Sequence, residues 1–433
     1  MRKKSPLLLV LLFPFPLEAQ QTLSLDEAIA LALKNNYAIT ISKNEAEINK
    51  NNLSYGNAGL LPTVNLLASG SFASNNTKQN YASGLEVNKT GVGSSTINSG
   101  VSLNWTLFDG MKMFATYDRL KVLNDMGLLQ SKITIESTVA SIINAYYNVV
   151  QQKQLIALTD TSIRIYEERV KISEMKLDIG SGSKLDLLQA KVDLNEQRSL
   201  RLNQLKALSD AKTLLNKLLS RAPDTELDVN DSIRITYEPK LEDLKNSVLQ
   251  NNNSVLFSQQ NVSMNNYLLT ETRSLYYPRL GVNLNYNFSN SENQAGFVLL
   301  NRNLGFNAGF TASWTIFNGF NTSRQVKNAK ISSLNSQLDY EQTKTEVNSE
   351  LMSAFTNFKN AMELLKLEED NFSIAKENVT VALESFRIGK TSSLELKTAQ
   401  TSFENARSRL VSARYQAKVA ETELLRLNGM LVK

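Results

Sequence analysis

The sequence predicts a mainly helical protein with a smaller β part, built from two copies of one unit. Three observations lead to this fold class. Two stretches of nearly seventy residues contain no proline and almost no glycine, four short segments alternate apolar and polar residues, and a block of over one hundred residues recurs at a constant offset. Together they indicate long coiled-coil helical hairpins joined to strands, with an internal duplication.

The chain has 433 residues and contains neither histidine nor cysteine. The lack of histidine excludes a His general base, a Ser-His-Asp triad and imidazole metal ligands. The lack of cysteine excludes disulfides, thiolate chemistry and a lipid anchor on cysteine. Only carboxylate, lysine or tyrosine catalysis remains, so we expect no enzyme, no metal and no cofactor, but a structural, binding or transport role.

Residues 1–19 have the features of a secretory signal peptide. Arg2, Lys3 and Lys4 precede the apolar run Leu7–Leu17, which is too short to span a bilayer, and Ala19 offers a small residue for cleavage. Removal of this segment lowers the formal net charge from +5 to +3, which argues against nucleic-acid binding. No later run reaches the ~18 apolar residues of a membrane helix, so any membrane part must consist of strands.

The internal repeat defines the predicted domains. Trp105–Gly110 (WTLFDG) recurs as Trp314–Gly319 (WTIFNG), 209 positions later, and the same offset holds without a gap to the end of the repeat. Because an insertion in a helix would rotate every later side chain, this indicates continuous helices. Upstream, Pro62 matches Pro278 at an offset of 216, so the first copy has seven additional residues, where we expect a variable loop.

The first repeat is predicted over 20–228 and the second over 229–433. In the first, we expect a helix, strands 63–73 and 99–108, a long helix 111–179 and a helix 183–220. In the second, we expect a helix 240–276, strands 279–289 and 307–317, a long helix 320–388 and a helix 392–428. The strands alternate cleanly: Val64 and Leu66, for example, are separated by Asn65.

Two kinds of sheet explain such strands. A soluble sheet covered on one face by helices is one. Three features favour a membrane barrel: opposite faces that are small and uncharged apart from Arg279, Trp105 and Trp314 placed for a membrane interface, and long polar loops at Asn75–Asn98 and Asn290–Phe306. Because four strands cannot close a barrel, the chain must oligomerise, with two copies giving eight strands and three giving twelve.

Each long helix ends in a similar turn, which we call a tip. The first tip contains Ile179, Gly180, Ser183, Leu185 and Asp186, and the second contains Ile388, Gly389, Ser392, Leu394 and Glu395. Glycine suits a left-handed helix C-cap, and serine with an acid three positions later suits an N-cap. Caps do not explain the apolar residues Ile179, Leu185, Ile388 and Leu394, which suit docking to a partner.

The duplicated order of these motifs resembles the TolC-like outer-membrane efflux proteins. The order is helix, Pro, two strands ending in W-x-L/I-F-D/N-G, long helix, I-G-x-x-S-x-L-D/E-L and helix, and it covers Leu23 to Leu427. The strand-to-helix turns of this pattern are Asp109-Gly110 and Asn318-Gly319. The resemblance implies a homotrimer in the outer membrane, with a twelve-stranded β-barrel continuous with a periplasmic α-barrel.

What the resemblance implies about function is a passive exit duct of a tripartite efflux pump or a type I secretion system. The tips would meet a periplasmic adaptor (membrane fusion) protein, and an inner-membrane pump would supply the energy for opening. Glu395 matches the first acidic position of the family's periplasmic entrance ring, whereas Thr398 stands where the second acid would be. Three copies of Glu395 would still form a negative ring.

Two rival interpretations stay open at the level of sequence. The chain could be an exported coiled-coil scaffold, or a membrane-associated structural protein without a channel. It could also be a carboxylate enzyme using Asp186 or Glu395, although neither has a paired acid in its motif. The transported substrate is open as well, since drugs, metal ions, siderophores and secreted polypeptides all suit a polar duct.

Overall fold

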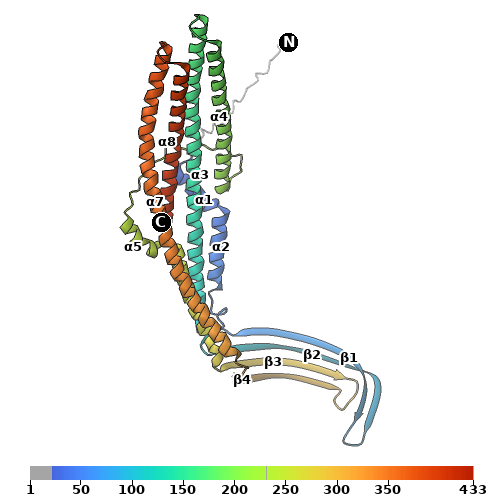
Figure 1. Ribbon diagram of the computed structural model, residues 1–433. Helices are drawn as coiled ribbons and strands as arrows, with labels where there is room; N and C mark the ends of the chain where they lie inside the picture. The colour runs from blue at the N-terminus through green and yellow to red at the C-terminus, as the bar shows by residue number, and fades with distance from the viewer. Residues whose placement is uncertain (1–21, 231, 433) are drawn as a thin grey trace, which may run out of the picture. The chain divides into compact units, whose positions relative to one another are not determined.

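The computed structural model describes residues 22–230 and 232–432, so the predicted signal peptide 1–19 lies outside the described residues. The described chain contains long helices and one four-stranded antiparallel sheet (Figure 1). Within those residues, no helix combines the length and apolar character needed to cross a membrane.

The chain forms two compact units, and each unit draws on both repeats. The first unit contains the described residues up to Thr40, Thr134–Ser247 and the described residues from Ser349. The second contains Ile41–Ile133 and Val248–Asn348. The predicted repeats are therefore interleaved and are not separate globular bodies.

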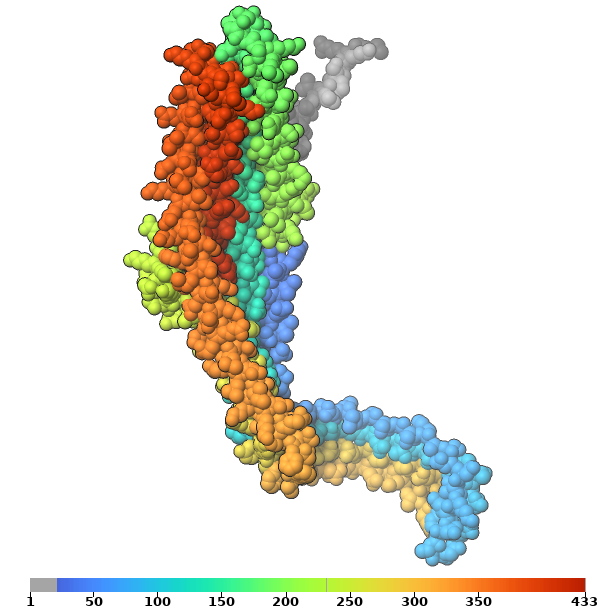
Figure 2. All heavy atoms as spheres, in the orientation of Figure 1, coloured from blue at the N-terminus to red at the C-terminus, as the bar shows by residue number. Residues whose placement is uncertain are grey.

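Helices make up the first unit. They are α1 (Leu25–Asn35), the later part of α3 (Lys112–Asp178), α4 (Lys184–Leu218), the start of α5 (Leu241–Asn251), the later part of α7 (Asn321–Arg387) and α8 (Ser393–Leu427). The ends of α3 and α7 lie one residue inside the predicted limits. In the space-filling view, α8 lies between α7 and α3 (Figure 2). An extensive apolar cluster of the first unit includes Ala28, Ile142, Val149, Leu215 and Leu227.

The second unit carries the sheet. It contains most of α2 (Tyr37–Asn52), the early parts of α3 and α7, α6 (Asn253–Arg273) and the short 3-10 helix η1 (Ser274–Tyr276). The strands β1 (Thr63–Asn80), β2 (Glu86–Phe108), β3 (Arg279–Asn293) and β4 (Leu300–Ser313) pair in the order β1-β2-β3-β4. The edges of β1 and β4 have no strand partner within the described chain.

The strand register confirms the predicted alternation. Leu66 pairs with Val101, Val101 with Tyr286, and Tyr286 with Phe306, so the apolar side chains of four strands form one row. The neighbouring row consists of Asn65, Ser102, Asn285 and Asn307. One face is therefore apolar and the other is polar, and large apolar side chains such as Phe72 are 80% exposed within the single chain.

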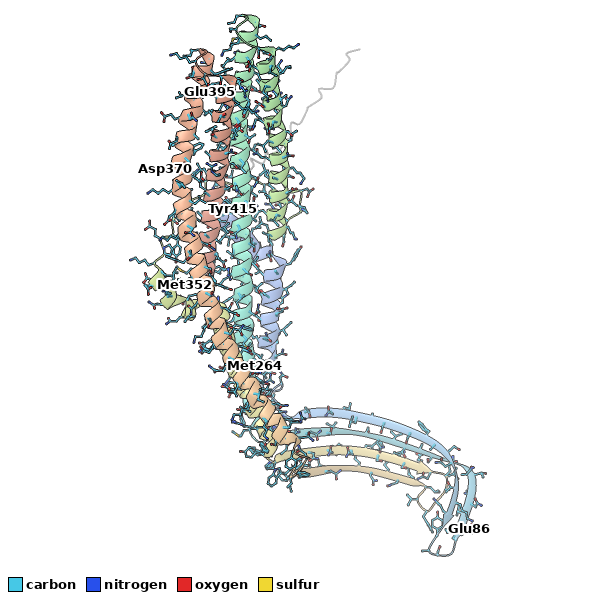
Figure 3. The ribbon with its side chains drawn as sticks, viewed as in Figure 1. Glu86, Met264, Met352, Asp370, Glu395 and Tyr415 are labelled. Carbon is cyan, nitrogen blue, oxygen red and sulfur yellow. The ribbon has the colours of Figure 1, made fainter. Side chains whose placement is uncertain are left out.

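The predicted strand ends and loops are wrong in three places. The interval 75–98 is mostly strand, because β1 runs to Asn80 and β2 starts at Glu86, with a turn at 81–85. In the predicted loop 290–306, only 294–299 lies between strands. The predicted strand 307–317 ends too late, because β4 covers Leu300–Ser313 and 314–317 is not strand. The seven additional residues lengthen the β1-β2 hairpin, whose end carries Glu86 (Figure 3). Polar residues obscured these strands, since alternation is visible only where one face is apolar.

The single helix predicted over 240–276 is also wrong. The chain breaks at Asn252 into α5 and α6, and α6 is followed directly by η1. The Asn252 side chain accepts hydrogen bonds from the backbone N–H groups of Ser254 and Val255, at 2.9 and 3.2 Å. Asn36, its counterpart 216 positions earlier, does the same between α1 and α2. Asparagine competes locally with the helical hydrogen bonds and starts a new helix.

Candidate functional site: the helical tips

The two tips lie at the same end of the first unit, and Glu395 marks the second (Figures 1 and 3). Both α3 and α7 end at a glycine with positive φ, Gly180 at 73° and Gly389 at 76°. The Gly180 N–H donates to the Leu177 carbonyl and the Ser181 N–H to the Lys176 carbonyl, and the second tip repeats both bonds. This is a Schellman motif, which satisfies the last carbonyls of each helix.

Serines cap the helices that leave the tips, as the spacing predicts. The Asp186 N–H donates to Ser183 Oγ at 3.0 Å, and the Glu395 N–H donates to Ser392 Oγ at 3.2 Å. Only the second tip completes a capping box, because the Ser392 N–H also donates to Glu395 Oε2 at 2.8 Å. That hydrogen bond lowers the pKa of the Glu395 carboxyl. At neutral pH, Glu395 therefore carries a full negative charge at the tip.

The apolar tip residues are exposed. Ile179 and Leu185 are 77% and 75% exposed, and Ile388 and Leu394 of the second tip are similarly exposed. Thr398 lies one turn beyond Leu394 and donates its hydroxyl to the Leu394 carbonyl at 3.0 Å. The structure thus brings the predicted tip residues to one end of the unit and leaves four large aliphatic side chains in solvent. Such a set is typical of a protein-binding surface.

A buried ion-pair network lies behind the tips and joins the two helical hairpins. Arg169 of α3 and Asp193 of α4 are 1% and 3% exposed, and Arg169 Nη1 lies 2.9 Å from Asp193 Oδ2. Lys397 Nζ of α8 lies 2.9 Å from Asp193 Oδ1. Arg169 also donates to Gln400 Oε1 and Ser393 Oγ of α8, at 3.2 and 3.1 Å.

The groups around Asp193 keep its carboxyl ionised. Burial by itself favours the protonated acid, but hydrogen bonds from Lys397 and Gln189 and the charge of Arg169 lower the pKa of the Asp193 carboxyl. Two further contacts join α3 to α7: Lys176 Nζ donates to the Phe386 carbonyl at 2.6 Å, and Arg387 pairs with Glu168 at 2.9 Å. Near the tips, these polar and ionic contacts hold the hairpins together beside a small buried apolar cluster of Ile172, Phe386 and Leu396.

This network was not predicted from the sequence. The comparison of the two copies contained a signal for it, since Arg169 and Asp193 stand where the second copy has Asn378 and Ser402. A charged pair that only one of the two repeats carries indicates a contact that only this repeat makes. The spacing of residues within one helix cannot reveal the network, because Arg169 lies on α3, Asp193 on α4 and Lys397 on α8.

The strand-to-helix turns belong to the second unit, and both glycines have positive φ, Gly110 at 73° and Gly319 at 66°. The Met113 N–H donates to Asp109 Oδ1, and the Thr322 N–H donates to Asn318 Oδ1. A Cβ at Gly110 would meet the Ser274 carbonyl at 2.6 Å, whereas a Cβ at Gly319 would meet only the Asn321 side chain, at 3.9 Å. These residues shape the turns and offer no reactive group.

The fold and the tips define a class of protein with long helical hairpins, exposed aliphatic tips and a four-stranded sheet that has one apolar face. In the described residues, no three acidic side chains are grouped so that they could hold a metal ion. The model of the outer membrane efflux protein family matches residues 28–221 and 244–430. The chain therefore belongs to the outer membrane efflux protein family, which confirms the predicted family and its outer-membrane location.

Known proteins share the whole length of the chain at low identity. The outer membrane efflux protein BepC of Brucella suis biovar 1 (strain 1330) is 22% identical, over 98% of this chain and 89% of the relative. The proteases secretion protein PrtF of Dickeya chrysanthemi is 20% identical, over 96% and 90%. The Campylobacter jejuni CmeC outer membrane channel has a similar fold, with a TM-score of 0.78 at 19% identity, over 94% of this chain and 85% of that chain.

Proposed function

We propose that three copies of this chain form the exit duct of a tripartite efflux pump or a type I secretion system. A periplasmic adaptor and an inner-membrane pump are its partners, and adaptor contacts open the duct at the helical tips. The relatives named for efflux and for protease secretion support the two settings of this proposal.

One observation supports the proposed duct most directly: the sheet has an apolar face, a polar face and two unpaired edges. Unpaired backbone groups are not tolerated in lipid, so β1 and β4 must each find a strand in another copy. Since β1 and β4 are antiparallel, β4 of one copy continues the antiparallel pattern into β1 of the next. The family resemblance favours three copies and twelve strands.

Cysteine cross-linking tests this arrangement, because the natural chain contains no cysteine. One cysteine in β1 (Asn65→Cys) is combined with one in β4, scanned over Asn303, Gly305 and Asn307. Within one chain, β1 and β4 are three strand spacings apart, about 14 Å, too far for a disulfide. We expect a covalent trimer on non-reducing gels for one register. Covalent dimers of the single Asn65→Cys variant would contradict the proposal, since they require β1 to pair with β1.

The exposed aliphatic side chains of the tips support adaptor docking. We expect Ile179→Asp combined with Ile388→Asp to abolish co-purification with the adaptor and export, while the trimer persists. Leu202→Asp is the matched control, because Leu202 is an equally exposed leucine on α4 away from the tips. Equal export by the tip variant and the control would remove the tips from the proposal.

Opening at the tips is supported by the chemistry of the contacts behind them. Arg169, Asp193 and Lys397 exchange hydrogen bonds that water can replace when the hairpins separate. The apolar surface that opening exposes there includes the small cluster of Ile172, Phe386 and Leu396. Weakening the outer contacts by Lys397→Gln should raise the single-channel conductance in planar bilayers. An unchanged conductance would place the opening motion elsewhere.

A further inference from the structure

Where β2, β3 and β4 pair with one another, the polar face of the sheet carries a single charge. In the register-paired rows from Arg279 and Ser313 to Ser291 and Asn301, the polar face consists of Asn, Ser, Thr, Gly, one Leu and Arg279. Arg302 of β4 is on the apolar face, in the row of Ile97 and Asn290. A lone charge among neutral amides dominates the electrostatic potential of such a surface.

Arg279 is held at the first position of β3, beside the strand-to-helix turns. Its Nη2 donates to Thr106 Oγ1 at 2.9 Å, and no carboxylate of the described chain forms an ion pair with it. The side chain is exposed and borders a hollow of about 170 Å³ lined by Asn104, Thr106, Gly281 and Thr311. Gly281 leaves the space next to the guanidinium open, because a Cβ there would meet only the Trp105 carbonyl, at 3.4 Å.

We propose that Arg279 is a specificity-determining residue that favours the passage of anions through the β part of the duct. The proposal rests on the proposed function, because closure of the sheet turns its polar face towards the lumen and repeats Arg279 around it. Charge rings of this kind set ion preference in pores. The solutes favoured are those with carboxylate or phosphate groups, which a guanidinium binds in bidentate fashion.

The predicted effect depends on salt concentration. The screening length is about 10 Å at 0.1 M salt and about 30 Å at 0.01 M, so an exposed ring acts across a wide lumen only at low salt. Glu395 places the opposite charge at the tips, and its contribution must be separated from that of Arg279.

The experiment measures reversal potentials of the full-length purified protein in planar bilayers under a tenfold KCl gradient, at low and high salt. Arg279→Gln is compared with Arg279→Lys and with wild type, each also combined with Glu395→Gln. Arg302→Gln is the control, because it removes the same charge from the neighbouring strand β4 on the opposite face of the sheet. The oligomer of each variant is verified in detergent before reconstitution.

We expect Arg279→Gln to raise the K⁺/Cl⁻ permeability ratio about twofold at low salt, and less at high salt, while Arg279→Lys and Arg302→Gln stay near wild type. The same shift is expected with and without Glu395→Gln. A channel whose ion preference is unchanged by Arg279→Gln, or changed as much by Arg302→Gln, overturns this proposal alone. If wild type forms no conducting oligomer, the proposed function fails instead.

Discussion

The long helices α3 and α7 are matched in sequence but not in surroundings. Each has 67 residues, at an offset of 209. Between Val139 and Val150, α3 buries side chains on several sides, whereas the matched stretch of α7 buries one stripe that contains Leu351, Ala354 and Phe358. In the first unit, α3 lies between α4 and α8, while α7 packs beside α8 (Figure 1).

This difference shows how one duplicated helix serves two positions. A helix between two neighbours needs apolar residues around most of its circumference, and a helix with one neighbour needs a single stripe. Val150 and its counterpart Lys359 illustrate it: Val150 is fully buried, and Lys359 is exposed.

The buried pair of the first repeat should respond most strongly. Asp193→Ala leaves Arg169 buried beside no carboxylate, and we expect a loss of about 3–5 kcal/mol of unfolding free energy in urea. Replacing both residues by apolar ones (Arg169→Met with Asp193→Leu) should cost less. Ser402→Ala, at the matched exposed position of the second repeat, should stay within about 0.5 kcal/mol. Equal losses for Asp193→Ala and Ser402→Ala would contradict a network specific to one repeat.

The same pair predicts an acid response. Because the pKa of Asp193 is lowered in the folded state, its ionised form contributes stability above the unfolded pKa, near 4, which is lost as pH falls through the lower folded pKa. Asp193→Asn should therefore lose less stability than wild type between about pH 5 and pH 2. Urea titrations at each pH measure this difference, and parallel curves for the two proteins would refute it.

Exchanging side chains between α3 and α7 should have the next largest effect. Val150→Lys places a charge among buried residues and should cost about 3 kcal/mol, while Lys359→Val should change stability by about 0.5 kcal/mol or less. The shift of the urea midpoint, followed by circular dichroism of the helices, measures both. A large loss for Lys359→Val would mean that α7 needs its polar face in contact with something other than water.

At the tips the repeats should respond alike. Gly180→Val and Gly389→Val face open space, so each should cost only the left-handed backbone penalty, about 1–2 kcal/mol. We expect both to loosen the turns and weaken adaptor binding. Gly182→Ala should act by contact instead, since its Cβ would meet Lys176 Cβ at 2.8 Å, and its counterpart Thr391→Ala should be neutral. Co-purification with the adaptor and thermal unfolding separate these cases.

The caps should show the smallest effect. Ser183→Ala and Ser392→Ala each remove an N-cap hydrogen bond worth about 1 kcal/mol. Exchange of the first-turn amide hydrogens should accelerate more in Ser392→Ala than in Ser183→Ala, because only Ser392 belongs to a complete capping box. Faster exchange at the first tip would reverse this order.

Much of the fold could be predicted because it depends on local rules. The gapless offset led to helices whose ends differ by one or two residues from those observed, and both tip glycines have the positive φ that a Schellman motif needs. The strand ends failed where both faces are polar, as at Thr77–Asn80. The break at Asn252 was not predicted because a single asparagine interrupts an otherwise helical pattern. Only its match with Asn36 makes the break recognisable.

The sequence by itself determined the duplication, the two faces of the sheet and the caps of the tips, because these depend on residues close together in the chain. Only the tertiary structure decided which long helix is central and that Arg169, Asp193 and Lys397 meet behind the tips. It also isolated Arg279 on the polar face. Such contacts join residues up to 231 positions apart, and their free energy depends on burial and on partners that no local pattern contains.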